Sequence, residues 1–211
     1  MSLRSPLHCL AGPLTAALAG GALILLLQSM PEGPPALEYR RAALPTEPWR
    51  LLTGHLVHVN WTHALVNAGA WLVLAWLFAP QLDTRRQLSS LALGAAFISL
   101  ALAGWHPSIE WYRGASGALH ALFFAGASAA VGTSLRGRSA RSARSALAPL
   151  ALLAAGWIKV ALEQPGGSAT PYAEWLAATT VPQAHLAGAL AGTLLGLFFA
   201  ARGPRRPGIS G

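Results

Sequence analysis

Six separate apolar runs, each close to the length of a membrane-spanning helix, constrain the fold of this chain more than any other feature. A helix needs about 20 residues to cross a bilayer, with a range of about 17–25. The runs cover residues 10–28, 63–79, 87–104, 116–134, 146–163 and 182–201. Charged residues make up only 10% of the chain, whereas a soluble domain carries about 25%. The sequence therefore predicts an all-α membrane protein of six transmembrane helices, forming a single domain over residues 1–211.

The first run has an alternative interpretation as a cleaved signal peptide, because Arg4 precedes it. Its apolar part is longer than the 7–15 residues typical of a signal peptide, and no A-x-A cleavage site follows it. We therefore expect this helix to be retained. The single cysteine, Cys9, excludes an internal disulfide and fits no zinc-binding spacing.

The basic residues of the connections predict the orientation. If the N-terminus lies inside, the inner segments carry Arg4, Arg85, Arg86, Arg136, Arg138, Arg141, Arg144, Arg202, Arg205 and Arg206. The outer segments then carry Arg40, Arg41, Arg50, Arg113 and Lys159, together with all the acids except Asp83. Inner loops of membrane proteins are enriched in Lys and Arg. We therefore expect both termini inside, with a basic tail over residues 202–211.

This orientation brings polar residues from distant parts of the chain to one depth. The second, fourth and sixth helices all run from outside to inside, so their first turns lie at the outer surface. Those turns carry His63, Asn67, Ser116, His120 and His185. Polar side chains within a membrane are costly and usually face the bundle interior or a water-filled cavity. We therefore expect a polar site just below the outer surface.

The stretch YRGASGALH contains the candidate nucleophile, Ser116. A serine hydroxyl needs a base within hydrogen-bonding reach, and His185 is the candidate. Glycines follow His185 on the same helix face, four residues apart, and would let the fourth helix approach closely through Gly117. These glycines are Gly188, Gly192 and Gly196. The alternative is that Ser116 only caps its helix and that His185 is a packing residue.

His63 and Asn67 are four residues apart and therefore share one face of the second helix. In a hydrolytic site, both could donate to the oxyanion of a tetrahedral intermediate, together with the backbone N–H of Ser116. The alternative is a metal site formed by His63 with His55 and His58. The spacing differs from H-E-x-x-H and no carboxylate or Cys lies nearby, so we expect no metal and no cofactor.

Together these residues resemble the rhomboid intramembrane serine proteases, over all six spans. Trp49-Arg50 is similar to the Trp-Arg pair of that family, and His58, His63 and Asn67 match the spacing of its second-helix residues. Gly114-Ala-Ser116-Gly117 matches its G-x-S-G, and His185 with Gly188 and Gly192 matches its sixth-helix pattern. The resemblance implies a rhomboid-like bundle in which Ser116 and His185 form a catalytic dyad without a carboxylate. It also implies an oxyanion hole made of His63, Asn67 and the backbone of Ser116.

Within the family, the chain looks most like the rhombosortases, by the stretches RGASGALHAL, KVALEQ and PQAHLAGALAG. That resemblance implies a bacterial inner-membrane protein whose active site faces the periplasm. Its partners would be the lipid bilayer and the transmembrane segments of membrane-anchored substrates with a C-terminal Gly-Gly motif. His120 stands where many rhomboids have a Tyr, and we expect its ring to stack on or hydrogen-bond with His185. Lys159 and Glu163 are four residues apart, and we interpret them as a structural ion pair.

Other classes of function remain as alternatives. A rhomboid-like pseudoprotease would bind transmembrane helices without cutting them, but the chain keeps both Ser116 and His185. An inverted internal repeat would favour a small transporter, and the sequence contains no such repeat. Nucleic-acid binding is not expected, because the basic residues lie in short tracts between apolar runs. We interpret the connection over residues 164–181 as a lid over the site.

Overall fold

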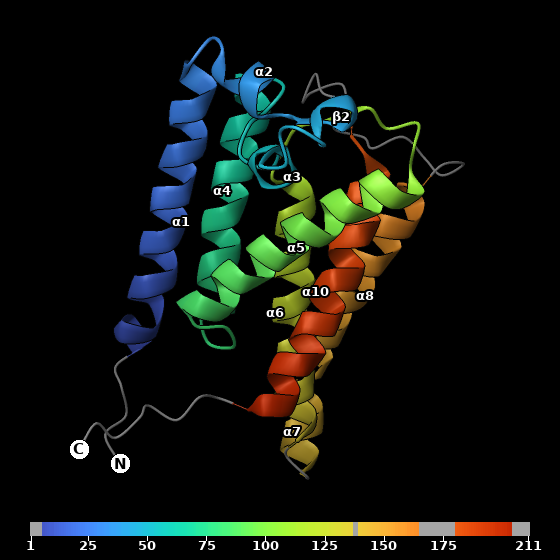
Figure 1. The fold of residues 1–211 in the computed structure, drawn as a ribbon. Helices are drawn as coiled ribbons and strands as arrows, with labels where there is room; N and C mark the ends of the chain where they lie inside the picture. The colour runs from blue at the N-terminus through green and yellow to red at the C-terminus, as the bar shows by residue number, and fades with distance from the viewer. Residues whose placement is uncertain (1–5, 137–138, 165–179, 204–211) are drawn as a thin grey trace, which may run out of the picture.

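The fold was analysed in a computed structural model, which describes residues 6–136, 139–164 and 180–203. The chain forms a bundle of long helices, with short helices and loops gathered at one end (Figure 1). The long helices are α1 (Pro6–Ser29), α4 (Trp61–Phe78), α5 (Thr84–Trp105), α6 (Ser116–Leu135), α8 (Leu147–Leu162) and α10 (Pro182–Arg202). The short helix α7 (Ala140–Ser145) precedes α8.

Six helical segments are long and apolar enough to span a membrane, which confirms the predicted all-α fold with six spans. The fifth span, Arg141–Leu162, includes both α7 and α8. Polar caps define where two of the spans begin. The Asn60 side chain accepts the backbone N–H of His63 at 2.8 Å, and that of Asp83 accepts the N–H of Arg86 at 2.8 Å. Each cap satisfies a backbone donor that the first helical turn leaves without a partner.

Helix α6 forms the centre of the bundle and is the most buried of the six spans. It contacts α4, α5, α8 and α10, and its contact with α10 is the most extensive in the molecule. Small residues make this close approach possible. An added Cβ would lie 2.2 Å from the carbonyl oxygen of Gly117 at Gly188, and 2.3 Å from that of Ala121 at Gly192. At Gly196, it would lie 2.4 Å from the carbonyl oxygen of Ala125. The predicted glycine face of α10 therefore rests directly on the α6 backbone.

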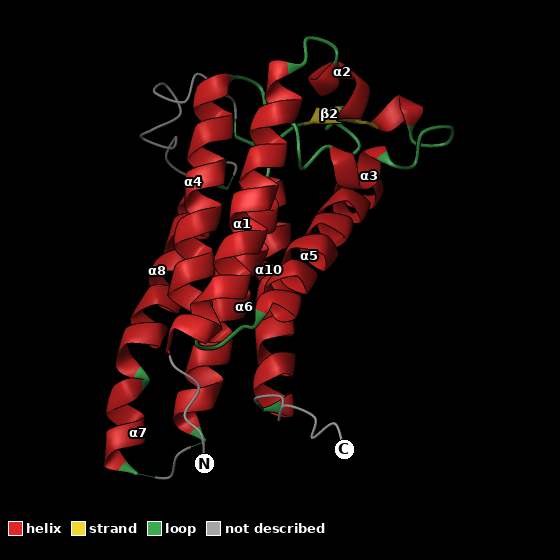
Figure 2. Cartoon of the chain, turned by 90° about the vertical axis from the view of Figure 1, so that its left-hand side faces the viewer, coloured by secondary structure: helices red, strands yellow, loops and turns green. Residues whose placement is uncertain are grey.

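The end of the bundle near α2 (Gly33–Leu37) is covered by the long first connection (Figure 2). This connection also contains β1 (Tyr39–Arg40), a 3₁₀ turn (Arg41–Ala43) and α3 (Arg50–Thr53). Strand β1 pairs antiparallel with β2 (Trp111–Tyr112), the segment that leads into α6. This two-residue ladder was not predicted, because it is too short to show a periodic pattern.

Charged residues fix the first connection in place. The Glu38 carboxylate pairs with Arg40 at 2.5 Å and with Arg113 at 2.6 Å. The Arg41 guanidinium donates to carbonyl oxygens at the end of α5, including that of His106 at 2.7 Å. Arg50 is buried and donates to the carbonyl oxygen of Glu38 at 2.9 Å. Within the described residues, Arg50 of the predicted Trp-Arg pair therefore has a structural role, while Trp49 is half exposed.

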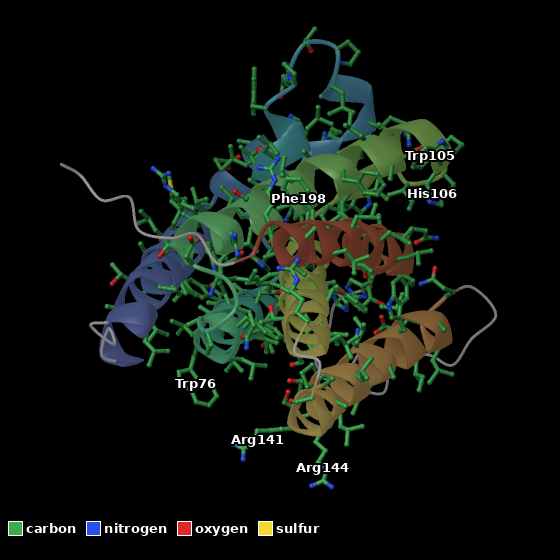
Figure 3. The ribbon with its side chains drawn as sticks, turned by 90° about the horizontal axis from the view of Figure 1, so that it is seen from below. Trp76, Trp105, His106, Arg141, Arg144 and Phe198 are labelled. Carbon is green, nitrogen blue, oxygen red and sulfur yellow. The ribbon has the colours of Figure 1, made fainter. Side chains whose placement is uncertain are left out.

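The opposite end of the bundle carries the basic residues of α7. Arg141 and Arg144 project outward when the molecule is seen from below (Figure 3). Trp76 of α4 also points away from the bundle, as a lipid-facing side chain would (Figure 3). The two ends of the molecule therefore differ in charge. The orientation of these ends across the membrane stays a prediction.

Candidate active site

Ser116 and His185 meet across the contact between α6 and α10. The Ser116 Oγ lies 3.0 Å from Nε2 of His185, within hydrogen-bonding distance. Ser116 is the first residue of α6, and His185 lies in the first turn of α10 and is buried. Because Gly188, about one turn after His185, packs on the backbone of Gly117, the hydroxyl and the imidazole can meet without intervening side chains. The structure therefore brings together the predicted nucleophile and base.

A carboxylate completes this arrangement, which the sequence analysis did not expect. The Glu163 Oε2 lies 2.9 Å from Nδ1 of His185, on the side of the ring away from Ser116. Glu163 directly follows the last residue of α8 and is buried. The family resemblance implies a dyad without a carboxylate, whereas in the described geometry Ser116, His185 and Glu163 are joined in series. Glu163 also pairs with Lys159 at 2.8 Å, as predicted, but this ion pair is not its only contact.

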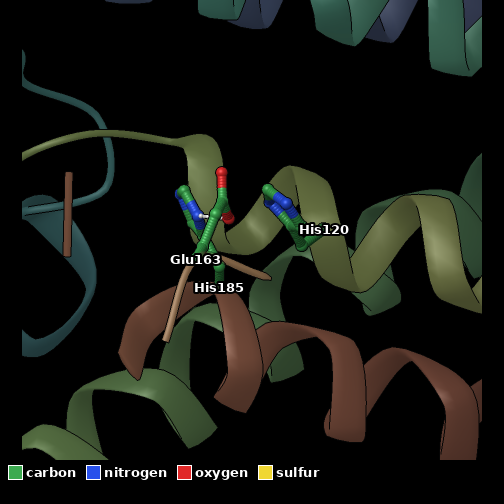
Figure 4. A group of neighbouring side chains, drawn as sticks. All are labelled: His120, Glu163 and His185. Carbon is green, nitrogen blue, oxygen red and sulfur yellow. Dashed lines mark hydrogen bonds and ion pairs between the residues drawn. The ribbon is translucent and has the colours of Figure 1, made fainter. Parts of the chain in front are cut away.

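Lys159 and His120 extend the network back to Ser116. His120 lies beside His185 and Glu163 (Figure 4). The Lys159 Nζ lies 3.0 Å from Nε2 of His120, and Nδ1 of His120 lies 2.7 Å from the carbonyl oxygen of Ser116. The contacts form a closed ring that starts at the Ser116 carbonyl and ends at its hydroxyl. Every polar group in the ring has a partner, which is the condition for stability of a buried network.

The partners in this ring assign the histidine tautomers. A carbonyl oxygen only accepts, so His120 carries its proton on Nδ1, and its Nε2 accepts from the Lys159 ammonium. The Glu163 carboxylate also only accepts, so His185 carries its proton on Nδ1. The free lone pair on Nε2 of His185 therefore faces the Ser116 hydroxyl, as a general base requires.

His120 also stacks on His185, as the sequence analysis expected. The ring centroids are 4.1 Å apart and the planes differ by 17°. This contact fixes the plane of the His185 imidazole, while Glu163 fixes its rotation within that plane. A His at residue 120 therefore supplies both a stacking face and a polar link to Lys159.

The loop before α6 is held in an unusual conformation at Gly114. Its φ is +129°, and an added Cβ would lie 2.7 Å from Cε1 of His63. The Tyr112 hydroxyl donates to the carbonyl oxygen of Gly114 at 2.7 Å. Burial raises the pKa of Tyr112 to about 12, so its hydroxyl keeps its proton. Gly114 therefore lets the chain turn tightly beside the His63 ring and deliver Ser116 to the start of α6.

His58 supports the same loop from the other side. Its Nε2 accepts the backbone N–H of Ala115 at 3.3 Å, and its ring meets that of His63 edge-on at 4.9 Å. His55 contacts the Ser99 hydroxyl at 3.0 Å. Burial lowers the pKa of His58 to about 3 and that of His55 to about 4, so both remain neutral. Their contacts suit loop support better than the metal site considered as an alternative.

The two candidate oxyanion side chains, His63 and Asn67, make different contacts. The His63 ring packs against Gly114, whereas the Asn67 amide donates to the carbonyl oxygen of His63 at 2.8 Å. Both residues are buried. Within the described ranges, no hydrogen bond joins Asn67 to Ser116. The backbone offers further donors, because the first hydrogen bond of α6 runs from Leu119 to Ala115 at 2.9 Å. The N–H groups before Leu119 therefore have no partner within the helix.

Three side chains in the network have ligand atoms close enough to hold a metal ion. These atoms, from His120, Glu163 and His185, lie within 4.8 Å of one another. Each residue already has a hydrogen-bonding partner, and the Lys159 ammonium lies between His120 and Glu163. A cation placed there would be repelled by that ammonium. The group therefore fits a hydrogen-bonded network better than a metal centre.

Comparison with protein families identifies the chain. Residues 45–202 match the Rhomboid domain. The chain belongs to the rhomboid family. It is accordingly a multi-pass membrane protein with six helical spans, and the rhomboid family indicates an intramembrane serine protease. A search of curated proteins finds no match to this rhomboid.

Two members of the site could not be assigned their place from the sequence. Lys159 and Glu163 are four residues apart, so an ion pair within one helix already accounts for both charges. Their spacing alone therefore gives no sign of a contact with the site. A signal was nevertheless present, since both charges lie at the predicted depth of His185. The predicted lid over residues 164–181 lies largely outside the described residues.

Proposed function

We propose that this rhomboid is an intramembrane serine endopeptidase with Ser116 as the nucleophile and His185 as the general base. The observation that carries the proposal is the 3.0 Å contact between Ser116 Oγ and Nε2 of His185. The assigned tautomer supports it, because the lone pair of Nε2 faces the hydroxyl. The close packing of α6 on α10 also supports it, because this packing holds the two side chains in a fixed relative position.

The proposed reaction proceeds through an acyl-enzyme. His185 takes the Ser116 proton as Oγ attacks the scissile carbonyl carbon, and a tetrahedral oxyanion forms. His185 then gives this proton to the leaving amine as the peptide C–N bond breaks. In the second half, a water molecule loses a proton to His185 and attacks the ester, and the proton returns to the Ser116 oxygen.

The oxyanion would be stabilised at the start of α6. The backbone N–H groups of this first turn and the positive end of the helix dipole favour negative charge. His63 lies against Gly114 and can contribute a ring N–H, while Asn67 can contribute its second amide hydrogen. Loss of one such donor typically lowers the rate by about 10²–10³-fold. Asn67 is the weaker candidate of the two side chains, because its amide already donates to His63.

The substrates we propose are membrane-anchored proteins cut close to the outer membrane face. Peptide bonds within a helix are protected by its hydrogen bonds, so glycines that weaken the helix would expose the scissile carbonyl. A Gly-Gly pair before the anchor, as in rhombosortase substrates, meets this requirement. We further propose that both termini face the cytoplasm and that the site faces the periplasm of a bacterial inner membrane.

The decisive experiment compares wild-type protein with Ser116→Ala in proteoliposomes. The substrate is a reporter with Gly-Gly, one membrane helix and a basic tail. We expect a single cut near Gly-Gly, detected by mass spectrometry, and loss of cleavage by at least about 10³-fold in the variant. Ser128→Ala is the matched control, because Ser128 is a buried serine deeper in the same helix. Normal cleavage by Ser116→Ala would refute the assignment.

Labelling with a fluorophosphonate probe separates a protease from a pseudoprotease. The probe forms a covalent bond only with an activated serine hydroxyl, so wild type and Ser128→Ala should be labelled. Ser116→Ala should not be labelled. A wild-type protein that stays folded in detergent but remains unlabelled at Ser116 would favour a helix-binding pseudoprotease.

A further inference from the structure

Charged residues at the end of α8 are unusual in their position. α8 belongs to the least buried of the six spans, yet the side chain of Glu163, directly after its last residue, is only 4% exposed. Burying a carboxylate at membrane depth is costly, and such groups usually have partners and functions. The ion pair with Lys159 provides a partner for only one carboxylate oxygen of Glu163, Oε1. The second oxygen instead reaches across to another helix and contacts His185 at 2.9 Å.

We propose that Glu163 is a positioning residue for His185 and that Lys159 holds its carboxylate in place. The inference rests on the proposed function, since it assigns a third member to the same site. The geometry is that of a nucleophile, a base and an orienting carboxylate in sequence. Ser116 Oγ lies 3.0 Å from Nε2 of His185, and Nδ1 of the same ring lies 2.9 Å from Glu163.

The carboxylate acts on His185 in two ways. As an acceptor, it keeps the proton on Nδ1, so that the lone pair of Nε2 points at Ser116. As a negative charge, it stabilises the imidazolium that forms when His185 takes the serine proton. Both effects depend on the charge of Glu163 and not on its volume. An amide of the same size would therefore not replace it.

Lys159 has the opposite electrostatic effect on the same ring. Its ammonium lies 2.8 Å from Oε1 of Glu163, which leaves Oε2 for His185. The ammonium also donates to His120, whose ring stacks on His185. Lys159 therefore fixes the carboxylate and the stacking ring together. Its positive charge, however, opposes the formation of an imidazolium nearby.

The charged and titratable groups that face His185 come from three helices. Glu163 and Lys159 lie at the end of α8, His120 lies on α6, and His63 of α4 interacts with His185 electrostatically. Within the described part of the chain, Glu163 carries the only negative charge in direct contact with the ring. Removing either charge should therefore shift the pH profile of the site, in opposite directions for the two residues.

The test measures the rate of fluorophosphonate labelling of Ser116 between pH 5 and pH 10, in detergent micelles. In Glu163→Gln, the Lys159 ammonium keeps the amide oxygen, so the NH₂ group faces Nδ1 of His185 and favours the wrong tautomer. We expect the labelling rate to fall by about 10²–10⁴-fold, following the loss seen when a triad carboxylate becomes an amide. The acidic limb of the profile should move to lower pH.

Lys159→Met should give the opposite displacement. Without the ammonium, the imidazolium forms more readily, so the acidic limb should move to higher pH. The rate at the plateau should fall less than in Glu163→Gln, because the carboxylate remains. Glu110→Gln is the matched control, since it makes the same chemical change at an exposed acid. Its profile should equal that of the wild type.

The results separate the possible roles. An acidic limb that does not move in Glu163→Gln, with a rate within about threefold of wild type, would overturn the proposal. If the acidic limb moved in the same direction in Glu163→Gln and in Lys159→Met, the proposal would also be overturned. The Lys159–Glu163 ion pair would then be a structural link for α8. If thermal denaturation shows that Glu163→Gln is not folded, the displacement of the acidic limb in Lys159→Met decides the question alone. Failure of the wild type to label at Ser116 would instead refute the proposed function itself.

Discussion

Gly114 meets two demands that other residues would meet only at a cost. Its φ of +129° lies in a region that L side chains rarely adopt, and the His63 ring fills the space where a Cβ would stand. The next two residues deliver the backbone of α6 and the hydroxyl of Ser116. The conformation of one residue therefore determines where the nucleophile lies relative to His185.

Gly114→Ala should consequently lower both stability and activity. Strain of this kind costs about 1–3 kcal/mol, and displacement of Ser116 should slow fluorophosphonate labelling by at least about tenfold. The thermal midpoint in detergent and the labelling rate would check this. Gly69→Ala and Gly104→Ala serve as controls, because an added Cβ meets nothing within 4 Å at either position. A variant at Gly114 with wild-type labelling would contradict the assigned role of the loop.

The residues of the site differ in how far the sequence could predict them. Ser116 and His185 follow from the helix order, since both stand in first turns at the same end of the bundle. His120 follows from its spacing of four residues after Ser116. The role of Glu163 does not, because its contact with His185 depends on how α8 lies against α10. Local spacing showed only the partner on its own helix, Lys159.

The contact between α6 and α10 is the element on which the site depends. Ser116 stands on one helix and His185 on the other, so any separation of the two axes opens the hydrogen bond between them. Glycines on α10 allow the carbonyl oxygens of α6 to approach to van der Waals distance. In lipid, packing of this kind replaces the hydrophobic effect as the source of helix association.

Gly192→Leu should therefore disrupt the site, although residue 192 lies about two turns beyond His185 on α10. An added Cβ would lie 2.3 Å from the carbonyl oxygen of Ala121, which is backbone and cannot move aside. Overpacking typically costs about 1–3 kcal/mol, so we expect a lower thermal midpoint in detergent and loss of labelling at Ser116. Ala201→Leu is the matched control, because Ala201 is exposed on the same helix. Equal behaviour of the two variants would show that close helix contact is not required.

The long elements were predictable because each apolar run must satisfy its own backbone hydrogen bonds in lipid, and only a helix does so within one segment. The short elements of the first connection were not. β1 and β2 are two residues each, and they exist because Arg41, Arg50 and Glu38 hold the connection against the end of α5 and the segment before α6. Such contacts depend on the assembled bundle and leave no periodic signal.

At the level of the whole molecule, charge differs between the two ends. In the sequence, residues 135–145 carry four arginines and no acid, whereas the three arginines of residues 30–60 are matched by three acids. If the positive-inside rule governs this chain, the candidate site lies toward the outer side of the membrane. Water and soluble domains of substrates would then reach it from that side.

Single-cysteine labelling tests the orientation in intact cells. Cys9→Ser removes the single native thiol, and Thr46→Cys or Ser139→Cys then places one thiol at each end. We expect a membrane-impermeant maleimide to label Thr46→Cys in intact cells and Ser139→Cys only after lysis. Each variant should first be shown to retain labelling by fluorophosphonate. The reverse pattern of maleimide labelling would place the site on the cytoplasmic side.

The pairing of β1 with β2 bears on where this protein can be shortened. The family match starts at residue 45, yet Tyr39 and Arg40 pair with Tyr112 and Trp111, just before the turn into α6. Glu38 holds Arg113 in the same way. A fragment trimmed to the matched region would keep every reacting group but lose the strand beside them. We therefore expect the unit needed for the proposed activity to begin before residue 45 and to include β1 and Glu38.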